Sequence, residues 1–107
     1  MITTITRQMS FEDIKPKRKI RYFQILDRLM TGTKTAKEIA VELFDLEQTN
    51  TTDRNTTAPR LTELSKMGLV NVIGKKKCDY TGKTVAVYEI TPKGIETRYE
   101  NHIPRLD

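Results

Sequence analysis

Apolar residues recur at intervals of three and four across residues 17–30, which is the repeat of one buried helix face. The positions are Ile20, Phe23, Leu26, Leu29 and Met30. Gly32 follows as a plausible helix-ending residue, and the turn at 31–34 is short. The pattern predicts a first helix over 17–30 and a second helix that packs steeply against it.

The second helix is predicted to begin at Thr35. Thr35 and Glu38 have the Thr-x-x-Glu spacing of a capping box, in which each side chain binds the free backbone N–H of the other residue. The expected buried stripe is Ala36, Ile39, Ala40 and Leu43. Glu38, Glu42 and Asp45 lie on the other side, and we interpret them as a solvated helix face rather than a metal site. Residues 47–52 are polar and without apolar periodicity, so they predict a loop.

A third helix is predicted over about residues 53–67, ended by Gly68. Its expected buried residues are Leu61, Leu64 and Met67. Pro59 leaves the start of this helix open, because proline costs ~3 kcal/mol inside a helix but little in its first turn. Either residues 53–56 form a separate tight turn and the helix begins near Thr57, or its first turn is kinked.

Two short β-branched runs, 69–73 and 85–90, are separated by a polar, glycine-containing link at 74–84. They predict a β-hairpin with a long tip. Thr91, Pro92 and Gly94 predict the start of a final short helix that reaches about Tyr99. Before the first helix, residues 1–7 are either an arm or an edge strand, and residues 10–14 resemble a capped one-turn helix that Pro16 would end.

The 107 residues suffice for one compact domain. We expect an N-terminal arm at 1–16, a folded domain at 17–101 and a tail at 102–107. The predicted class is α+β, with a three-helix core, a two- or three-stranded β-hairpin and a short C-terminal helix. Helix, helix, helix and hairpin in this order is the winged helix-turn-helix arrangement.

Positive charge is concentrated in two places. The chain carries 19 Lys and Arg against 14 Asp and Glu, a net charge of +5 that attracts polyanions. Two runs hold nine of these cations and one acid, Asp79. The runs are Lys15, Lys17, Arg18, Lys19 and Arg21, followed by Lys75, Lys76, Lys77 and Lys83. Because they flank the predicted helix-turn-helix, they favour a nucleic-acid-binding surface over ordinary solvated faces.

Several classes of protein are disfavoured by composition. Cys78 is the one cysteine and His102 the one histidine, which exclude an internal disulfide and disfavour a structural zinc site, so we expect no cofactor. No stretch approaches the ~18 apolar residues of a membrane span, and we expect a cytoplasmic protein without a membrane partner. We interpret Cys78 as a packing residue, the alternative being a redox-sensitive thiol. Tyr80 and Tyr88 are interpreted as hairpin packing rather than base-stacking residues.

Three segments carry a resemblance to known proteins. The stretch Ala58-Pro-Arg-Leu-Thr-Glu-Leu-Ser-Lys-Met-Gly-Leu-Val70 resembles the recognition helix and exit of winged-helix regulators of the MarR and PadR type, and Tyr88-Glu-Ile-Thr-Pro-Lys-Gly94 resembles the segment after their wing. Small phage-borne or prophage-borne winged-helix proteins are more closely similar, with a wing like Lys77-Cys78-Asp-Tyr-Thr81-Gly82-Lys-Thr84. The resemblance covers about residues 19–94. Unlike the MarR and PadR pattern, this sequence predicts no long C-terminal dimerisation helix.

The resemblance implies that the third helix lies in the major groove of DNA and the wing on the adjacent backbone. Base contacts are predicted for Arg54, Asn55, Thr56, Arg60 and Thr62, since Arg pairs with guanine and Asn with adenine. In the alternative, Asn and Thr cap the helix and Arg60 pairs with Glu63 or Glu47. Phosphate contacts are predicted for Thr35, Lys37, Lys75, Lys76, Lys77 and Lys83. The run at 15–21 either extends this footprint or is a solvated helix start.

The sequence therefore predicts a protein that is not an enzyme and that binds double-stranded DNA sequence-specifically, as a transcriptional regulator of a phage or prophage. The sequence leaves the oligomeric state open. A homodimer is the assembly that reading two DNA half-sites would require, because such half-sites are usually read by two-fold dimers. The alternative is a protein-interaction or phage replication-accessory module with weak or nonspecific DNA binding. RNA binding is a further, less favoured alternative.

Overall fold

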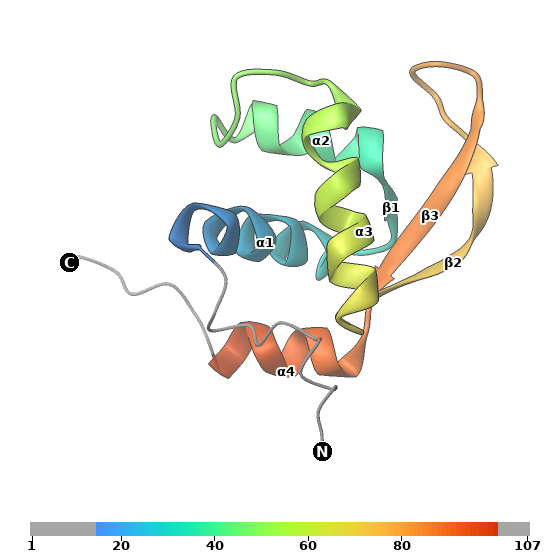
Figure 1. Ribbon diagram of the computed structural model, residues 1–107. Coiled ribbons are helices and arrows are strands. Elements are labelled where there is room, and N and C mark those ends of the chain that lie inside the picture. The colour runs from blue at the N-terminus through green and yellow to red at the C-terminus, as the bar shows by residue number, and fades with distance from the viewer. Residues whose placement is uncertain (1–14, 101–107) are drawn as a thin grey trace.

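The computed structural model describes residues 15–100, in which four α-helices surround one edge of a small antiparallel sheet (Figure 1). The elements are α1 (Pro16–Leu29), β1 (Lys34–Thr35), α2 (Ala36–Asp45), the 3-10 helix η3 (Arg54–Thr56), α3 (Ala58–Lys66), β2 (Val70–Lys77), β3 (Thr84–Ile90) and α4 (Pro92–Glu100). In Figure 1, α3 crosses in front of α1 and α2, the β2–β3 hairpin extends to one side, and α4 lies beneath. The expectations for the N-terminal arm and short helix, His102 and the C-terminal tail lie outside the described residues.

The first three helices and the start of β2 share one apolar core. Its buried members are Tyr22, Ile25, Leu26, Leu29, Ala36, Ile39, Leu43, Leu61, Leu64, Leu69 and Val70. The stripe predicted for α1 is partly wrong, because Ile20 is 44% exposed and Met30 38% exposed. The buried face of α1 includes Tyr22 and Ile25 instead, because α1 contacts α4 as well as α2 and α3. Helical periodicity alone does not say how many neighbours a helix has.

The sheet has three strands in the order β1-β3-β2. Its first strand was not predicted: Lys34 and Thr35 pair with Tyr88 and Val87 of β3. The predicted link at 74–84 was too long, because β2 continues to Lys77 and the tip is confined to residues 78–83. Polar residues fit this strand because, after Val70, its side chains are exposed to solvent on both faces. Pairing with β3 satisfies the hydrogen-bonding groups of its backbone. A bulge at residue 73 shifts the register and bends the wing.

The start of the third helix is resolved in favour of a separate turn. Asp53 caps η3, its carboxylate accepting the backbone N–H of Asn55 at 2.9 Å. The α-helix then begins at Ala58, so Pro59 lies in its first turn, where proline lacks a donor that would have had no helical partner. The polar residues 54–56 therefore precede α3 as a distinct turn.

Helix α4 is held against the rest of the domain at both ends. The Thr91 hydroxyl donates to the carbonyl of Gly68 at 2.7 Å and accepts the N–H of Gly94 at 2.9 Å. Near its other end, Arg98 forms two hydrogen bonds to the Asp27 carboxylate of α1, at 2.7 and 3.0 Å, and lies 4.9 Å from the ring centre of Phe23. A bidentate charged pair against an aromatic ring fixes the orientation of α4 as well as its position.

Candidate nucleic-acid interface

The N-terminus of α2 has the capping box that the sequence predicts. The hydroxyl of Thr35 accepts the N–H of Glu38 at 3.2 Å, and Glu38 Oε1 accepts the N–H of Thr35 at 2.9 Å. Thr35 is fully buried. Its hydroxyl is thus already engaged in shaping the start of the helix, while Lys37 in the first turn is partly exposed.

Glu38 also ties the wing to this helix. Its second carboxylate oxygen, Oε2, lies 2.8 Å from Nζ of Lys76 on β2. Burial by itself would raise the pKa of Glu38, but hydrogen bonds from Lys76 and from the Thr35 backbone lower the pKa below its ordinary value. One carboxylate therefore caps α2 and positions the wing at the same time.

A second contact between wing and helix runs through Lys37. Its ammonium donates to the carbonyl of Thr52 at 2.8 Å and lies 5.9 Å from the ring centre of Tyr80 at the wing tip. Between the two parts is a small cavity of about 40 Å³, lined in part by Arg54 and Cys78. Cys78 is 2% exposed, as its interpretation as a packing residue requires. The wing tip, the loop before η3 and the start of α2 thus form one connected surface.

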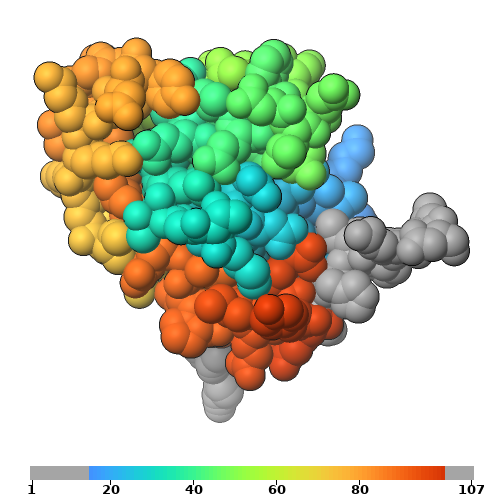
Figure 2. Space-filling model, turned by 180° about the vertical axis from the view of Figure 1, so that it is seen from behind, coloured from blue at the N-terminus to red at the C-terminus, as the bar shows by residue number. Residues whose placement is uncertain are grey.

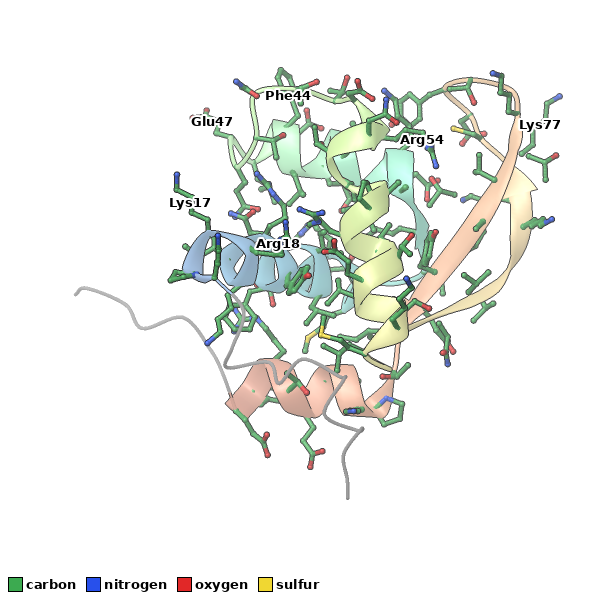
Figure 3. The ribbon with its side chains drawn as sticks, viewed as in Figure 1. Lys17, Arg18, Phe44, Glu47, Arg54 and Lys77 are labelled. Carbon is green, nitrogen blue, oxygen red and sulfur yellow. The ribbon has the colours of Figure 1, made fainter. Side chains whose placement is uncertain are left out.

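The side chains predicted to read bases differ in their solvent exposure and in their contacts within the protein. Arg54, Asn55 and Thr56 of η3 are exposed, and Figure 3 shows Arg54 at the leading end of α3. Thr62 is exposed too, and its hydroxyl donates to the carbonyl of Ala58 at 3.2 Å. Arg60 is the most constrained. Its guanidinium lies 2.9 Å from Glu63, which is the pairing that the sequence allowed as an alternative to base contact.

The lysines of the wing point in two directions, because successive side chains of a strand alternate between its faces. Lys76 faces α2 and is paired with Glu38. Lys75 and Lys77 lie on the other face and are exposed, as is Lys83 at the tip. Figure 3 shows Lys77 at the far end of the wing. Three of the four predicted wing cations thus have no ion pair within residues 15–100.

A second cationic group lies on the other side of α3. A pocket of about 380 Å³ is lined by Lys15, Lys17, Arg18, Arg21, Thr56 and Arg60. The pocket lies between the basic start of α1 and the segment formed by η3 and α3. It places Thr56 and Arg60, which were predicted to read bases, beside four cations for which no specific contact was predicted. The basic run at 15–21 was the available indication. Its proximity to Thr56 could not be read from the sequence.

The acidic face of α2 is occupied by ion pairs. Glu42 lies 2.9 Å from Lys34 and 3.4 Å from Arg28. Within residues 15–100, no three His, Cys, Asp or Glu side chains come together in a way that would hold a metal ion. None of the helices in this part of the chain combines the length and apolar composition that crossing a bilayer requires.

No protein-family model and no curated protein matches the sequence. Solved structures share the fold. A protein from Thermoplasma acidophilum described as a transcriptional regulator superposes with a TM-score of 0.66 at 19% identity, over 80% of each chain. PadR of Bacillus subtilis, solved with operator DNA, gives 0.65 at 20% identity, over 87% of this chain and 52% of PadR. A transcriptional regulator from Clostridium thermocellum gives 0.59 at 21% identity, over 81% and 82%. These likenesses confirm the predicted α+β winged-helix fold.

Proposed function

We propose that this protein is a sequence-specific regulator that binds double-stranded DNA, with η3 and α3 in the major groove and the wing on the adjacent backbone. The observation that carries the proposal is the exposed polar start of α3, where Arg54, Asn55 and Thr56 precede a helix on the outer surface. Figure 2 shows the opposite face, made of α1, α2, α4 and the wing, with α3 largely hidden behind them. The helix is thus presented on one side, where a groove about 12 Å wide admits it. PadR, with the same fold, was solved on operator DNA.

The contacts divide into two kinds. Arg54 and Asn55 have the side chains that pair with guanine and adenine edges, and we assign them the base reading, assisted by Thr56 and Thr62. Lys75, Lys77 and Lys83 carry charge without base-reading geometry, so we assign them to phosphates. Lys37 is assigned to a phosphate as well.

The remaining predicted site residues are held by contacts within the protein, and we assign them no base contact. Thr35 is buried in the capping box, so we assign it the positioning of α2 rather than a contact with DNA. Lys76 positions the wing through Glu38. Arg60 is held by Glu63 and lines the pocket beside α1.

The decisive experiment is selection of duplexes from a random library with the full chain. The expected result is a consensus sequence, and a palindromic one would support a homodimer reading two half-sites. On that site Asn55→Ala is expected to cost about 1 to 3 kcal/mol of binding free energy, while leaving random duplexes almost unaffected.

Lys77→Gln is the matched variant. It is expected to weaken all duplexes alike and to reduce the salt slope by about one, because it removes a phosphate contact and no base contact. If Asn55→Ala and Lys77→Gln act identically on every duplex, the assignment of base reading is wrong. If no duplex is bound at physiological salt, DNA binding itself is wrong. The wing segment resembles that of phage-borne proteins, so we extend the proposal to a regulator of a phage or prophage. Locating the selected consensus sequence within a phage or prophage genome would test this role.

A further inference from the structure

The pocket between α1 and α3 is the strongest unassigned feature of the described chain. Its lining combines four cations of the α1 start with Thr56 and Arg60. Lys15 and Lys17 form no ion pair within residues 15–100. Among the described residues, Glu63 is the carboxylate in contact with this group, 2.9 Å from Arg60 and 3.7 Å from Arg18. The positive charge that surrounds the pocket is therefore only partly compensated by the described residues.

The helix that supplies these cations adds to the field. No side chain in the described part of the chain caps the N-terminus of α1, and its first turn contains Pro16, Lys17, Arg18 and Lys19 but no acid. Free N–H groups and the helix dipole make such an end positive, and an acid there would normally compensate it. Here the first turn adds more positive charge instead. Such an end favours a bound anion.

The two guanidinium groups inside the pocket point to the same ligand. Burial and the nearby charge of Arg60 lower the pKa of Arg21, which means that the two cations disfavour one another. Arg21 donates to the neutral side chain of Gln24 at 3.0 Å and to the carbonyl of Gln48 at 3.4 Å, whereas Arg60 is paired with Glu63. The Nε atom of Arg60 is buried and has no hydrogen-bond partner within residues 15–100. Planar guanidinium groups that line a pocket suit an oxygen-rich anion such as phosphate.

We propose that this pocket binds a phosphate group of the DNA backbone, on the side of α3 opposite to the wing. The assignment deepens the proposed function and depends on it. In Figure 3, Lys17 and Arg18 lie to one side of α3 and Lys77 lies to the other. A helix inserted in the major groove has a phosphate backbone on each side of it. The wing then contacts one strand, and the α1 pocket contacts the other.

The test compares two variants that each lose one lysine charge. Lys17→Gln removes a cation of the pocket, whereas Lys93→Gln removes one from α4, at the base of the molecule. Duplex affinity of the full chain is measured between 0.1 and 1 M salt. Losing one phosphate contact should flatten the salt slope by ~0.9, which corresponds to about a fivefold loss of affinity at physiological salt. We expect this change for Lys17→Gln and not for Lys93→Gln. Equal slopes for both variants would overturn the assignment to the DNA backbone.

A duplex with one uncharged methylphosphonate linkage locates the contact. Moving this linkage along the flank of the bound site should identify a position at which Lys17→Gln no longer lowers affinity, because the charge that it faced is gone. Such a position supports the proposal. If the effect of Lys17→Gln is the same for every linkage, the pocket contacts no particular phosphate and the proposal is overturned.

Inorganic phosphate separates this site from the proposed function. In a titration of the free protein followed by amide resonances, the shifts should cluster at Lys17, Arg18 and Thr56 and should weaken in Lys17→Gln. If the wild-type protein binds no duplex but shows these shifts, the DNA assignment fails and the phosphate site stands. If neither phosphate nor DNA perturbs these residues, the pocket is not an anion site.

Discussion

The motif Thr91-Pro-Lys-Gly94 has a physical explanation that a single substitution can test. Gly94 lies on the face of α4 that packs against Leu69, just before β2, and against Ile90 at the end of β3. A Cβ built at this position would be 2.2 Å from the backbone oxygen of Leu69 and 2.8 Å from Cγ1 of Ile90. Ordinary contacts of a Cβ begin near 3.4 Å, so Gly94→Ala requires the backbone to move by about 1 Å. The Leu69 oxygen already accepts the N–H of Thr91 at 3.0 Å, so this movement also strains a hydrogen bond that docks the helix.

The expected cost follows from these contacts. Overpacking a buried site costs about 1 to 3 kcal/mol, and weakening one or two buried hydrogen bonds costs about 1 kcal/mol each. Alanine is the better helix former by about 1 kcal/mol, which offsets part of the loss. We therefore expect Gly94→Ala to lower the free energy of unfolding by about 3 kcal/mol and the melting temperature by about 12 to 24 °C.

Urea denaturation followed by circular dichroism measures this change. Gly74→Ala is the matched control, because a Cβ at Gly74 meets nothing within 4 Å and its backbone conformation suits any residue. The control should remain within about 0.5 kcal/mol of the wild type. If Gly94→Ala melts at or above the wild-type temperature, helix propensity dominates and close packing is not the reason for the glycine.

Three further predictions concern buried polar groups. The pKa of Glu38 is lower in the folded protein than its ordinary value of 4.5, so its ionised carboxylate stabilises the fold at pH values above 4.5. This stabilisation is lost as the pH falls through the folded-state pKa. Glu38→Gln, which keeps the cap but not the ion pair, should therefore show a weaker loss of unfolding free energy below pH 4.5 than the wild type. Burial and a 2.5 Å hydrogen bond to Glu63 raise the pKa of Tyr22 from 10.0 to about 12, so its contribution is complete below pH 10 and is lost between pH 10 and 12. This loss amounts to about 2 to 3 kcal/mol in urea denaturation, and it should be missing from Tyr22→Phe. Thr57 is fully buried and its hydroxyl has no partner within residues 15–100, so Thr57→Val should leave the midpoint of urea denaturation unchanged or raise stability by up to about 1 kcal/mol. A clear destabilisation would show that the hydroxyl is satisfied after all.

Features that depend on neighbours a few residues away follow from the residue spacing alone. The capping box of Thr35 and Glu38 and the cap formed by Thr91 both involve interactions across three residues or fewer. Such interactions have the same geometry in any helix, so their spacing predicts them. Apolar periodicity predicted the helices themselves. The helices and their caps together were sufficient to predict the order of elements in a winged helix.

Which of the predicted site residues are free to bind depends on long-range packing. Lys76 and Lys77 are equivalent in the sequence, yet only Lys76 meets Glu38, which lies 38 positions earlier. Likewise, Thr56 joins the basic start of α1 only through the packing of α1 against α3. Side-chain direction on a strand and the burial of a charge depend on long-range contacts, and no local pattern encodes them. The fold therefore followed from residue spacing, whereas the charged surface that it presents depends on how distant segments pack together.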